Sequence, residues 1–121
     1  MSERDVSESA AFVRGLASAF VPIAALEVDH RRSFDDLLPY VFLSEVAHWM
    51  VDQLIEDDPP PAILEGIIDY IERSLQRADP ELHSLIALGF VSNLPSTGER
   101  GASIRDLLGP GLAAEYELVN W

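Results

Sequence analysis

The sequence predicts a single all-α domain over residues 1–121, a compact bundle of five or six helices around a central apolar helix. Apolar residues recur at helical spacing in several segments that proline or glycine separates. Residues 79–93 are apolar on almost every side, which is typical of a helix with neighbours on both flanks. A chain of 121 residues with 48% hydrophobic residues has the length of one domain with a sizeable core. A HEAT-like stack of antiparallel helices is compatible with the same elements.

The first 32 residues contain one clear helix and one segment that is harder to interpret. A helix is expected over residues 2–20, and Pro22 ends or kinks it. The apolar side chains of this helix step by three and four: Val6, Ala10, Val13, Ala17 and Phe20. Residues 23–32 are expected to form either a linker or an irregular helical continuation, because apolar and acidic residues alternate there without a partner strand elsewhere.

Two longer helices are expected on either side of a proline run. The first extends from about residue 39 to residue 56, and the second from within the run to about residue 77. Asp57 and Asp58, followed by three prolines, interrupt the chain sharply between them. A short joint at residues 78–79 leads into the central helix, so we expect the second long helix and the central helix to pack as an antiparallel hairpin. A hairpin of the two long helices across the proline run would bring their acidic stripes together.

The central apolar helix has both a start signal and a stop signal. Asp79 can cap the free amides, and Pro80 suits the first helical position. Asn93 is expected to end the helix in a left-handed conformation. The apolar side chains between these signals point almost all round: Leu82, Leu85, Ile86, Leu88, Phe90 and Val91.

The C-terminal part is expected to hold a loop and two further helical segments. Residues 94–101 have the composition of a surface loop. Ser103 and Asp106 are interpreted as a capping pair for a short helix that Gly109 ends. A last helix is expected from Pro110 to Trp121.

Composition excludes several classes of protein. The chain has no cysteine, which rules out disulfides, thiolate metal sites and cysteine nucleophiles. No apolar run approaches the roughly 20 residues that span a bilayer. Residues 1–5 are charged and no hydrophobic stretch follows them, so no signal peptide is expected. We therefore expect a cytoplasmic protein.

Motifs for catalysis or metal binding are weak, and we expect neither an enzyme nor a cofactor. Glu45 and His48 form one Glu-x-x-His pair, with Asp52 and Glu56 on the same helix side, but a di-iron site needs a second pair that the chain lacks. There is no Gly-x-Ser-x-Gly elbow and no glycine-rich phosphate loop. His30, beside two arginines, is expected to be exposed.

Charge is the most informative feature of the composition. The chain has 21 acidic residues against 8 arginines and no lysine, for a net charge of −13. Such a chain is not expected to bind nucleic acid directly or to attach to anionic membranes, because like charges repel. A basic protein partner is the natural counterpart, and solubility alone is the alternative explanation.

The acidic residues are concentrated in one part of the chain. No lysine or arginine occurs between Ser33 and Glu72, so the acids of the two long helices are expected to merge into one exposed ridge that no arginine neutralises. Like charges four residues apart cost a helix a few tenths of a kcal/mol, a cost that suggests a binding role. The expected partner-binding residues include two aromatic anchors. The set is Glu45, Trp49, Asp52, Glu56, Asp57, Asp58, Glu65, Asp69, Tyr70 and Glu72.

Residues 85–94 (Leu-Ile-Ala-Leu-Gly-Phe-Val-Ser-Asn-Leu) and 104–110 (Ile-Arg-Asp-Leu-Leu-Gly-Pro) resemble a poorly characterised group of small bacterial helical proteins. In that group a helix ending in Gly-Phe-hydrophobic-x-Asn-Leu precedes an Ile-x-x-Leu-Leu-Gly-Pro turn. Some members resemble immunity proteins of polymorphic or contact-dependent toxin systems. The resemblance covers the C-terminal two-thirds of the chain, and its motifs carry the fold rather than an activity.

The sequence therefore favours an immunity or antitoxin-type protein. Such a protein would bind and inhibit a basic toxin domain, such as a nuclease, through its acidic surface. The alternative is a helical adaptor or dimerisation domain without a toxin partner, whose acidic residues serve solubility.

Overall fold

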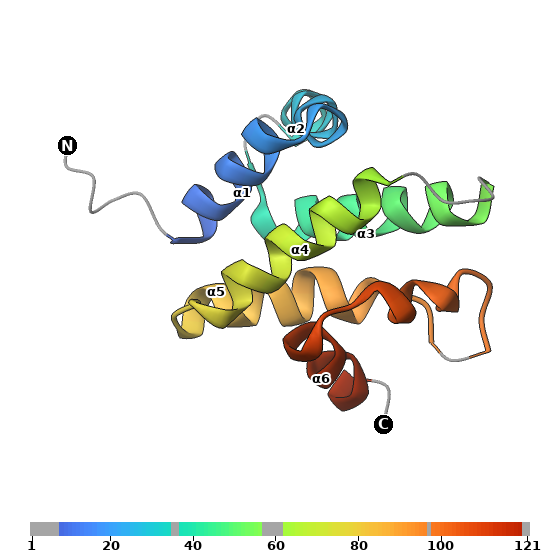
Figure 1. Cartoon of the computed structure of the whole chain (residues 1–121). Helices are drawn as coiled ribbons and strands as arrows, with labels where there is room; N and C mark the ends of the chain where they lie inside the picture. The colour runs from blue at the N-terminus through green and yellow to red at the C-terminus, as the bar shows by residue number, and fades with distance from the viewer. Residues whose placement is uncertain (1–7, 35–36, 57–61, 97, 120–121) are drawn as a thin grey trace.

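The computed structural model describes residues 8–34, 37–56, 62–96 and 98–119, and all regular secondary structure in these ranges is helical (Figure 1). The α-helices are α1 (Glu8–Ala19), α2 (Val21–Phe34), α3 (Pro39–Glu56), α4 (Ile63–Gln76), α5 (Pro80–Ser84) and α6 (Pro110–Val119). The prediction of an all-α fold is confirmed. Residues 23–32 belong to α2, so the helical alternative for that segment is correct. Among the described helices, none is long and apolar enough to cross a membrane.

Residues 79–93, which we call the central segment, change helical geometry twice. The α-helical turn α5 passes into a π-helix, Leu85–Phe90, and then into a 3-10 helix, Val91–Asn93. Asp79 caps the start as predicted, because its Oδ1 accepts a hydrogen bond from the Leu82 N–H at 2.9 Å. The expected left-handed stop at Asn93 is wrong. Asn93 lies in the 3-10 helix and its side-chain amide donates to the Gly89 carbonyl at 2.8 Å.

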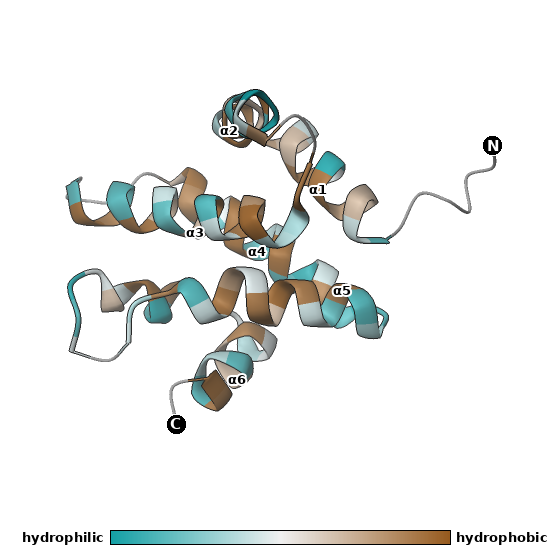
Figure 2. Ribbon diagram, turned by 180° about the vertical axis from the view of Figure 1, so that it is seen from behind, coloured by the Kyte–Doolittle hydropathy of each residue, from teal (hydrophilic) through white to brown (hydrophobic). Residues whose placement is uncertain are grey.

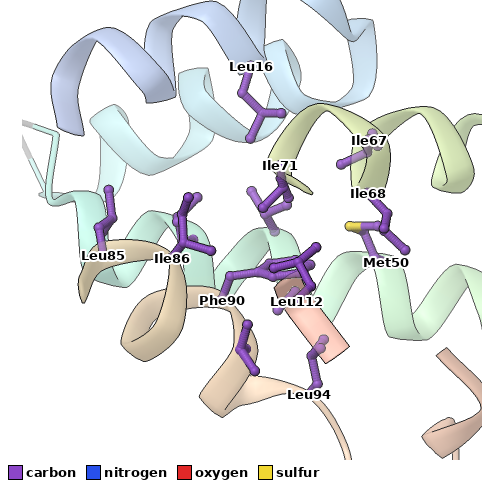
Figure 3. Packing of buried hydrophobic residues seen from close by; sticks show 14 of the residues in the cluster. Leu16, Met50, Ile67, Ile68, Ile71, Leu85, Ile86, Phe90, Leu94 and Leu112 are labelled. Carbon is purple, nitrogen blue, oxygen red and sulfur yellow. The ribbon is translucent and has the colours of Figure 1, made fainter. Parts of the chain in front are cut away.

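The central segment is the middle of the hydrophobic core. Its middle part is largely hydrophobic, between the more hydrophilic α5 and the loop that follows (Figure 2). Leu85, Ile86 and Phe90 are fully buried. Leu88 is 58% exposed, so the apolar side chains of this segment are not buried on every side. Figure 3 shows side chains from α1, α3, α4, the central segment and α6 converging on one core.

The expected hairpin between α4 and the central segment is not a main contact of the fold, because the two make few backbone contacts. The backbone of α3 packs mainly on the π-helix of the central segment, and that of α4 packs mainly on α6. Gly89 allows the first approach, since a Cβ atom there would lie 3.2 Å from Leu43 Cβ and 3.5 Å from Tyr40 Cα. A hairpin of α3 and α4 that would merge their acidic stripes is not a main contact either, because these two helices make few backbone contacts with each other.

Glu72 of α4 fixes the start of α6. Only 6% of this residue is exposed, and its two carboxylate oxygens accept hydrogen bonds from the Gly111 and Leu112 N–H groups, each at 2.9 Å. These amides belong to the first turn of α6 and have no partner within the helix. The residues around Pro110 leave room for the carboxylate. A Cβ atom at Gly109 would lie 2.7 Å from Glu72 Cδ, and one at Gly111 2.8 Å from its Oε2.

The hydrogen bonds of Glu72 also determine its protonation. Burial by itself would raise the pKa of the Glu72 carboxyl group. The hydrogen bonds from Leu112, from Gln76 Nε2 at 2.9 Å and from Gly111 outweigh burial and hold the pKa below its ordinary value. Glu72 is therefore an ionised carboxylate that complements the positive end of the α6 dipole.

Two more contacts hold α6 against the central segment and the loop that follows it. The Tyr116 hydroxyl donates to the Pro95 carbonyl at 2.7 Å, and His83 Nε2 lies 3.1 Å from Glu115 Oε2. His83 is exposed rather than part of the core. Together with Glu72 these contacts place the 3-10 helix Ala102–Leu107, which precedes α6, next to α4.

The substitution Glu72→Gln is expected to lower the free energy of unfolding by about 1–3 kcal/mol, because one of the two α6 amides loses its charged acceptor. Urea unfolding of the variant and the wild type measures the difference. Glu65→Gln, at an exposed position of the same helix, is the matched control and is expected to change it by less than about 0.5 kcal/mol. Equal stability of the two variants would contradict the capping role.

Stability is also expected to depend on pH through Glu72. Its pKa is lower in the folded chain than the ordinary value of 4.5, so its contribution is fully present above that value. The contribution is lost as the pH falls through the lowered pKa. Urea titrations over a pH series should show the gap between wild type and Glu72→Gln closing only on the acid side of the ordinary pKa. If the difference in stability between wild type and Glu72→Gln disappeared near neutral pH, the titration of another group would be responsible for it.

Candidate functional site

Four acidic side chains surround a hollow on one side of α4, which we call the α4 hollow. It has a volume of about 410 Å³. Glu65 and Asp69 come from α4, and Asp106 comes from the 3-10 helix before α6; all three are exposed. The carboxylate of Glu72 reaches the hollow from the core side, and Ile68, Leu107 and Gly109 complete the lining.

Glu72 does not belong to an exposed acidic stripe, which corrects the prediction from sequence. Its spacing from Glu65 and Asp69 places it on the same side of α4, but its carboxylate is turned to the start of α6. Because both oxygens are occupied by backbone amides, the residue stabilises the fold and is not available to contact a partner.

Asp69 is partly neutralised, which corrects the expectation of an acidic surface without arginine partners. Arg73 Nη2 lies 2.9 Å from Asp69 Oδ2, one helical turn further along α4. Both side chains are more than half exposed, so the pair contributes little to stability and remains open to exchange with another cation. Glu65 and Asp106 have no such partner among the described residues.

Glu45 of α3 is engaged by a buried histidine. His30 is 1% exposed, and its Nδ1 lies 3.0 Å from Glu45 Oε1. The Leu38 N–H donates to His30 Nε2 at 2.9 Å, so the hydrogen-bond network assigns the proton of the neutral ring to Nδ1. The expectation that His30 is exposed is wrong, because α2 continues through it and turns the ring towards Phe34 and Phe42.

Asp52 of α3 lines a second hollow, the α3 hollow, between α3 and residues 92–95 and 99–100. Its volume is about 530 Å³. His48 is exposed on the same side of α3, one helical turn before Asp52. The opposite wall includes Asn93, Glu99 and Arg100.

The acidic side chains of α3 and α4 thus line different hollows instead of one ridge. Asp52 belongs to the α3 hollow, whereas Glu65 and Asp69 belong to the α4 hollow. Glu56 is exposed at the end of α3, and the predicted sites Asp57 and Asp58 lie outside the described residues. The reason is that α4 makes its backbone contacts mainly with α6 and few with α3.

The two predicted aromatic anchors are half-buried and packed against the core. Tyr70 contacts Phe12 and Phe20, with ring centroids 6.1 Å and 6.0 Å apart. Its hydroxyl lies directly against Gly15 of α1, where no Cβ atom would fit. Trp49 packs on the core from α3. Both residues retain partial exposure, but their packing gives each a structural role.

The Glu-x-x-His pair of α3 does not converge on a metal site. Glu45 faces His30, whereas His48 lines the α3 hollow. No group of three or more metal-ligating side chains of histidine, aspartate or glutamate occurs within residues 8–34, 37–56, 62–96 and 98–119.

Asp106 and Glu99 were not among the predicted site residues. The sequence explains Asp106 as a partner of Ser103 in a capping pair, but Gly101 precedes the 3-10 helix and no side chain caps it. Glu99 lies in the loop, where its Oε1 accepts from the Ser96 N–H at 2.6 Å. Glu99 lies at the α3 hollow and Asp106 at the α4 hollow because of tertiary packing, which the spacing of neighbouring residues does not predict.

Comparison with known proteins gives one family. Residues 14–121 match the model of a family described as a domain of unknown function, DUF7674. No curated protein and no solved structure matches the chain.

The His30 network is expected to be structural. His30→Leu leaves the Leu38 amide without its acceptor and Glu45 without its donor, and should lower the free energy of unfolding by about 1–3 kcal/mol. The control is His48→Leu, at an exposed position of α3, with an expected change below about 0.5 kcal/mol. Thermal and urea unfolding of both variants provide the comparison. An effect of His48→Leu as large as that of His30→Leu would refute the assignment.

Proposed function

We propose that this chain, which belongs to the DUF7674 family, is a protein-binding module that recognises a basic protein partner through the α4 hollow. The observation that supports it is the convergence of Glu65, Asp69 and Asp106 on one exposed hollow of a chain with net charge −13. These residues come from two elements far apart in sequence, so the fold itself concentrates the negative charge there.

The electrostatics of the α4 hollow suit a positively charged protein. Clustered carboxylates raise the rate of encounter with a cationic surface by about 10- to 1,000-fold at low salt. The exposed Asp69–Arg73 pair is weak enough for a partner's arginine or lysine to replace it. Tyr70 is not part of the α4 hollow, but it lines a neighbouring pocket together with Asp69 and Arg73 and offers a half-exposed ring there.

The finer proposal is an immunity-type protein that inhibits a toxin domain, such as a basic nuclease. Its support is the resemblance of residues 85–94 and 104–110 to the bacterial helical proteins described above. In the structure these residues form most of the central segment and the approach to α6. The motifs therefore support a shared architecture, and the acidic α4 hollow supplies the argument for a basic partner.

A helical adaptor or dimerisation domain is the second candidate, and one observation favours it. Several large apolar side chains around the end of α2 and the start of α3, and on the central segment, are exposed: Phe34, Leu38, Tyr40, Val41 and Leu88. Light scattering coupled to size exclusion separates the candidates. A stable dimer that Tyr40→Ser dissociates would favour the adaptor, and a monomer would favour the partner-binding module.

Charge reversal should abolish partner capture. The tagged wild type and the double variant Glu65→Lys/Asp106→Lys are used to capture proteins from the source organism, with Glu117→Lys on α6 as the control at an exposed acid away from both hollows. We expect a basic protein that the wild type and the control retain and the double variant loses. The reconstituted complex should weaken as salt increases. Capture that is unchanged in the double variant would refute the α4 hollow as the site.

The immunity proposal has its own test. The products of the genes adjacent to this one are expressed in a heterologous bacterium with and without the chain. Growth arrest by one product, relieved by the wild type and not by Glu65→Lys/Asp106→Lys, is the expected result. Absence of any toxic neighbour would reject the immunity role and leave the binding module in place.

A further inference from the structure

We infer that the α3 hollow is a receptor for one arginine or lysine side chain, supplied by the basic partner. This inference rests on the proposed function for the source of the side chain, but it concerns a different part of the surface. The hollow is the larger of the two, about 530 Å³ against about 410 Å³, and it lies between α3 and the loop that follows the central segment. Among its polar side chains, Asp52 and Arg100 make no hydrogen bond or ion pair within the described residues.

Ser92 and Asn93 of the central segment line this hollow, and each uses a side-chain donor for a bond within the segment. The Ser92 hydroxyl donates to the Leu88 carbonyl, and the Asn93 side-chain amide donates to the Gly89 carbonyl. These bonds satisfy carbonyl groups near the end of the helical segment. The Asn93 Oδ1 and the lone pairs of the Ser92 hydroxyl remain as acceptors, and the Asn93 amide retains one further N–H donor.

Two carboxylates extend this set of acceptors. Asp52 makes no ion pair or hydrogen bond through its side chain within the described part of the chain. Glu99 uses Oε1 to accept from the Ser96 N–H and retains Oε2. Carboxylate and amide oxygens that accept no hydrogen bond from the protein can accept one from a guanidinium or ammonium group, which has only donors.

The apolar lining suits the stem of the same side chain. Val51, Leu94 and Pro95 contribute aliphatic surface between the polar groups. Arginine and lysine side chains bury their methylene groups on such surfaces while the charged end reaches polar partners. A metal ion would gain nothing from this apolar surface, and an anion would face two carboxylates.

Arg100 is the one group in the lining that opposes a cation. It forms no ion pair within the described residues, although Asp52 and Glu99 line the same hollow. His48, also exposed, adds a ring that is a donor or an acceptor according to its tautomer. Arg100 should therefore weaken cation binding by repulsion. Removal of its charge is expected to strengthen binding, whereas removal of the Asp52 charge is expected to weaken it.

The probe is N-acetyl-arginine amide, with N-acetyl-citrulline amide as the uncharged control of nearly the same shape. Each is titrated at low ionic strength into the full-length chain, and the backbone amide signals are followed by NMR. We expect the arginine probe to shift Ser92, Asn93 and Glu99, and the citrulline probe to shift them far less. Asp52→Asn should weaken binding by about twofold to fivefold, and Arg100→Gln should strengthen it by a similar factor. Glu117→Gln is the control for net charge and should change nothing.

Three outcomes would overturn the inference: equal binding of the two probes, shifts confined to the α4 hollow, or an affinity that Asp52→Asn and Arg100→Gln leave unchanged. The experiment needs no partner protein, so its failure is separable from failure of the proposed function. A basic partner captured through Glu65 and Asp106, with no probe bound near Asp52, would reject this site alone.

Discussion

The buried carboxylate of Glu72 is the interaction on which the arrangement of the C-terminal third depends. It accepts the free amides of the first turn of α6, and it does so because Gly109 and Gly111 leave no side chain in its way. A charge buried without such donors would cost several kcal/mol, so α4 and α6 are held in one relative position. The 3-10 helix before α6 is thereby fixed against α4, and Asp106 is brought next to Glu65 and Asp69. The α4 hollow therefore depends on Glu72, which lines it and whose hydrogen bonds to α6 bring Asp106 next to α4.

The large excess of acid is divided between structure and surface. Glu72 caps a helix, Glu45 accepts from His30 and Asp69 pairs with Arg73. Four other exposed carboxylates lie at two hollows that tertiary packing separates, Asp52 and Glu99 at the α3 hollow and Glu65 and Asp106 at the α4 hollow. Further exposed acids, such as Asp29 and Glu81, lie at neither. Net charge alone therefore overstates the acidic surface, because part of it is consumed by internal contacts. The carboxylates that are left support the two proposals, a cationic partner at the α4 hollow and a single cationic side chain at the α3 hollow.

The sequence predicted where most helices lie, but it did not predict which residues from distant parts of the chain contact one another. The cap at Asp79 and the bounds of α3 follow from neighbouring residues, which is why they were predictable. Glu72 was misplaced because its partners lie 39 and 40 residues further along the chain, and helical spacing made it look like part of an exposed stripe. One signal was available: α6 begins Gly-Pro-Gly without a capping side chain, so its free amides require an acceptor from elsewhere. His30 had no comparable signal, since its partners lie 8 and 15 residues away in other elements.

Amide hydrogen exchange at Gly111 and Leu112 tests the central role of Glu72 most directly. In the wild type both amides are expected to exchange slowly, because each donates to a buried carboxylate. In Glu72→Gln their exchange should accelerate by roughly tenfold to a hundredfold relative to amides of the central segment, which serve as an internal reference. Rapid exchange at both positions in the wild type, or rates unchanged by the substitution, would contradict the account.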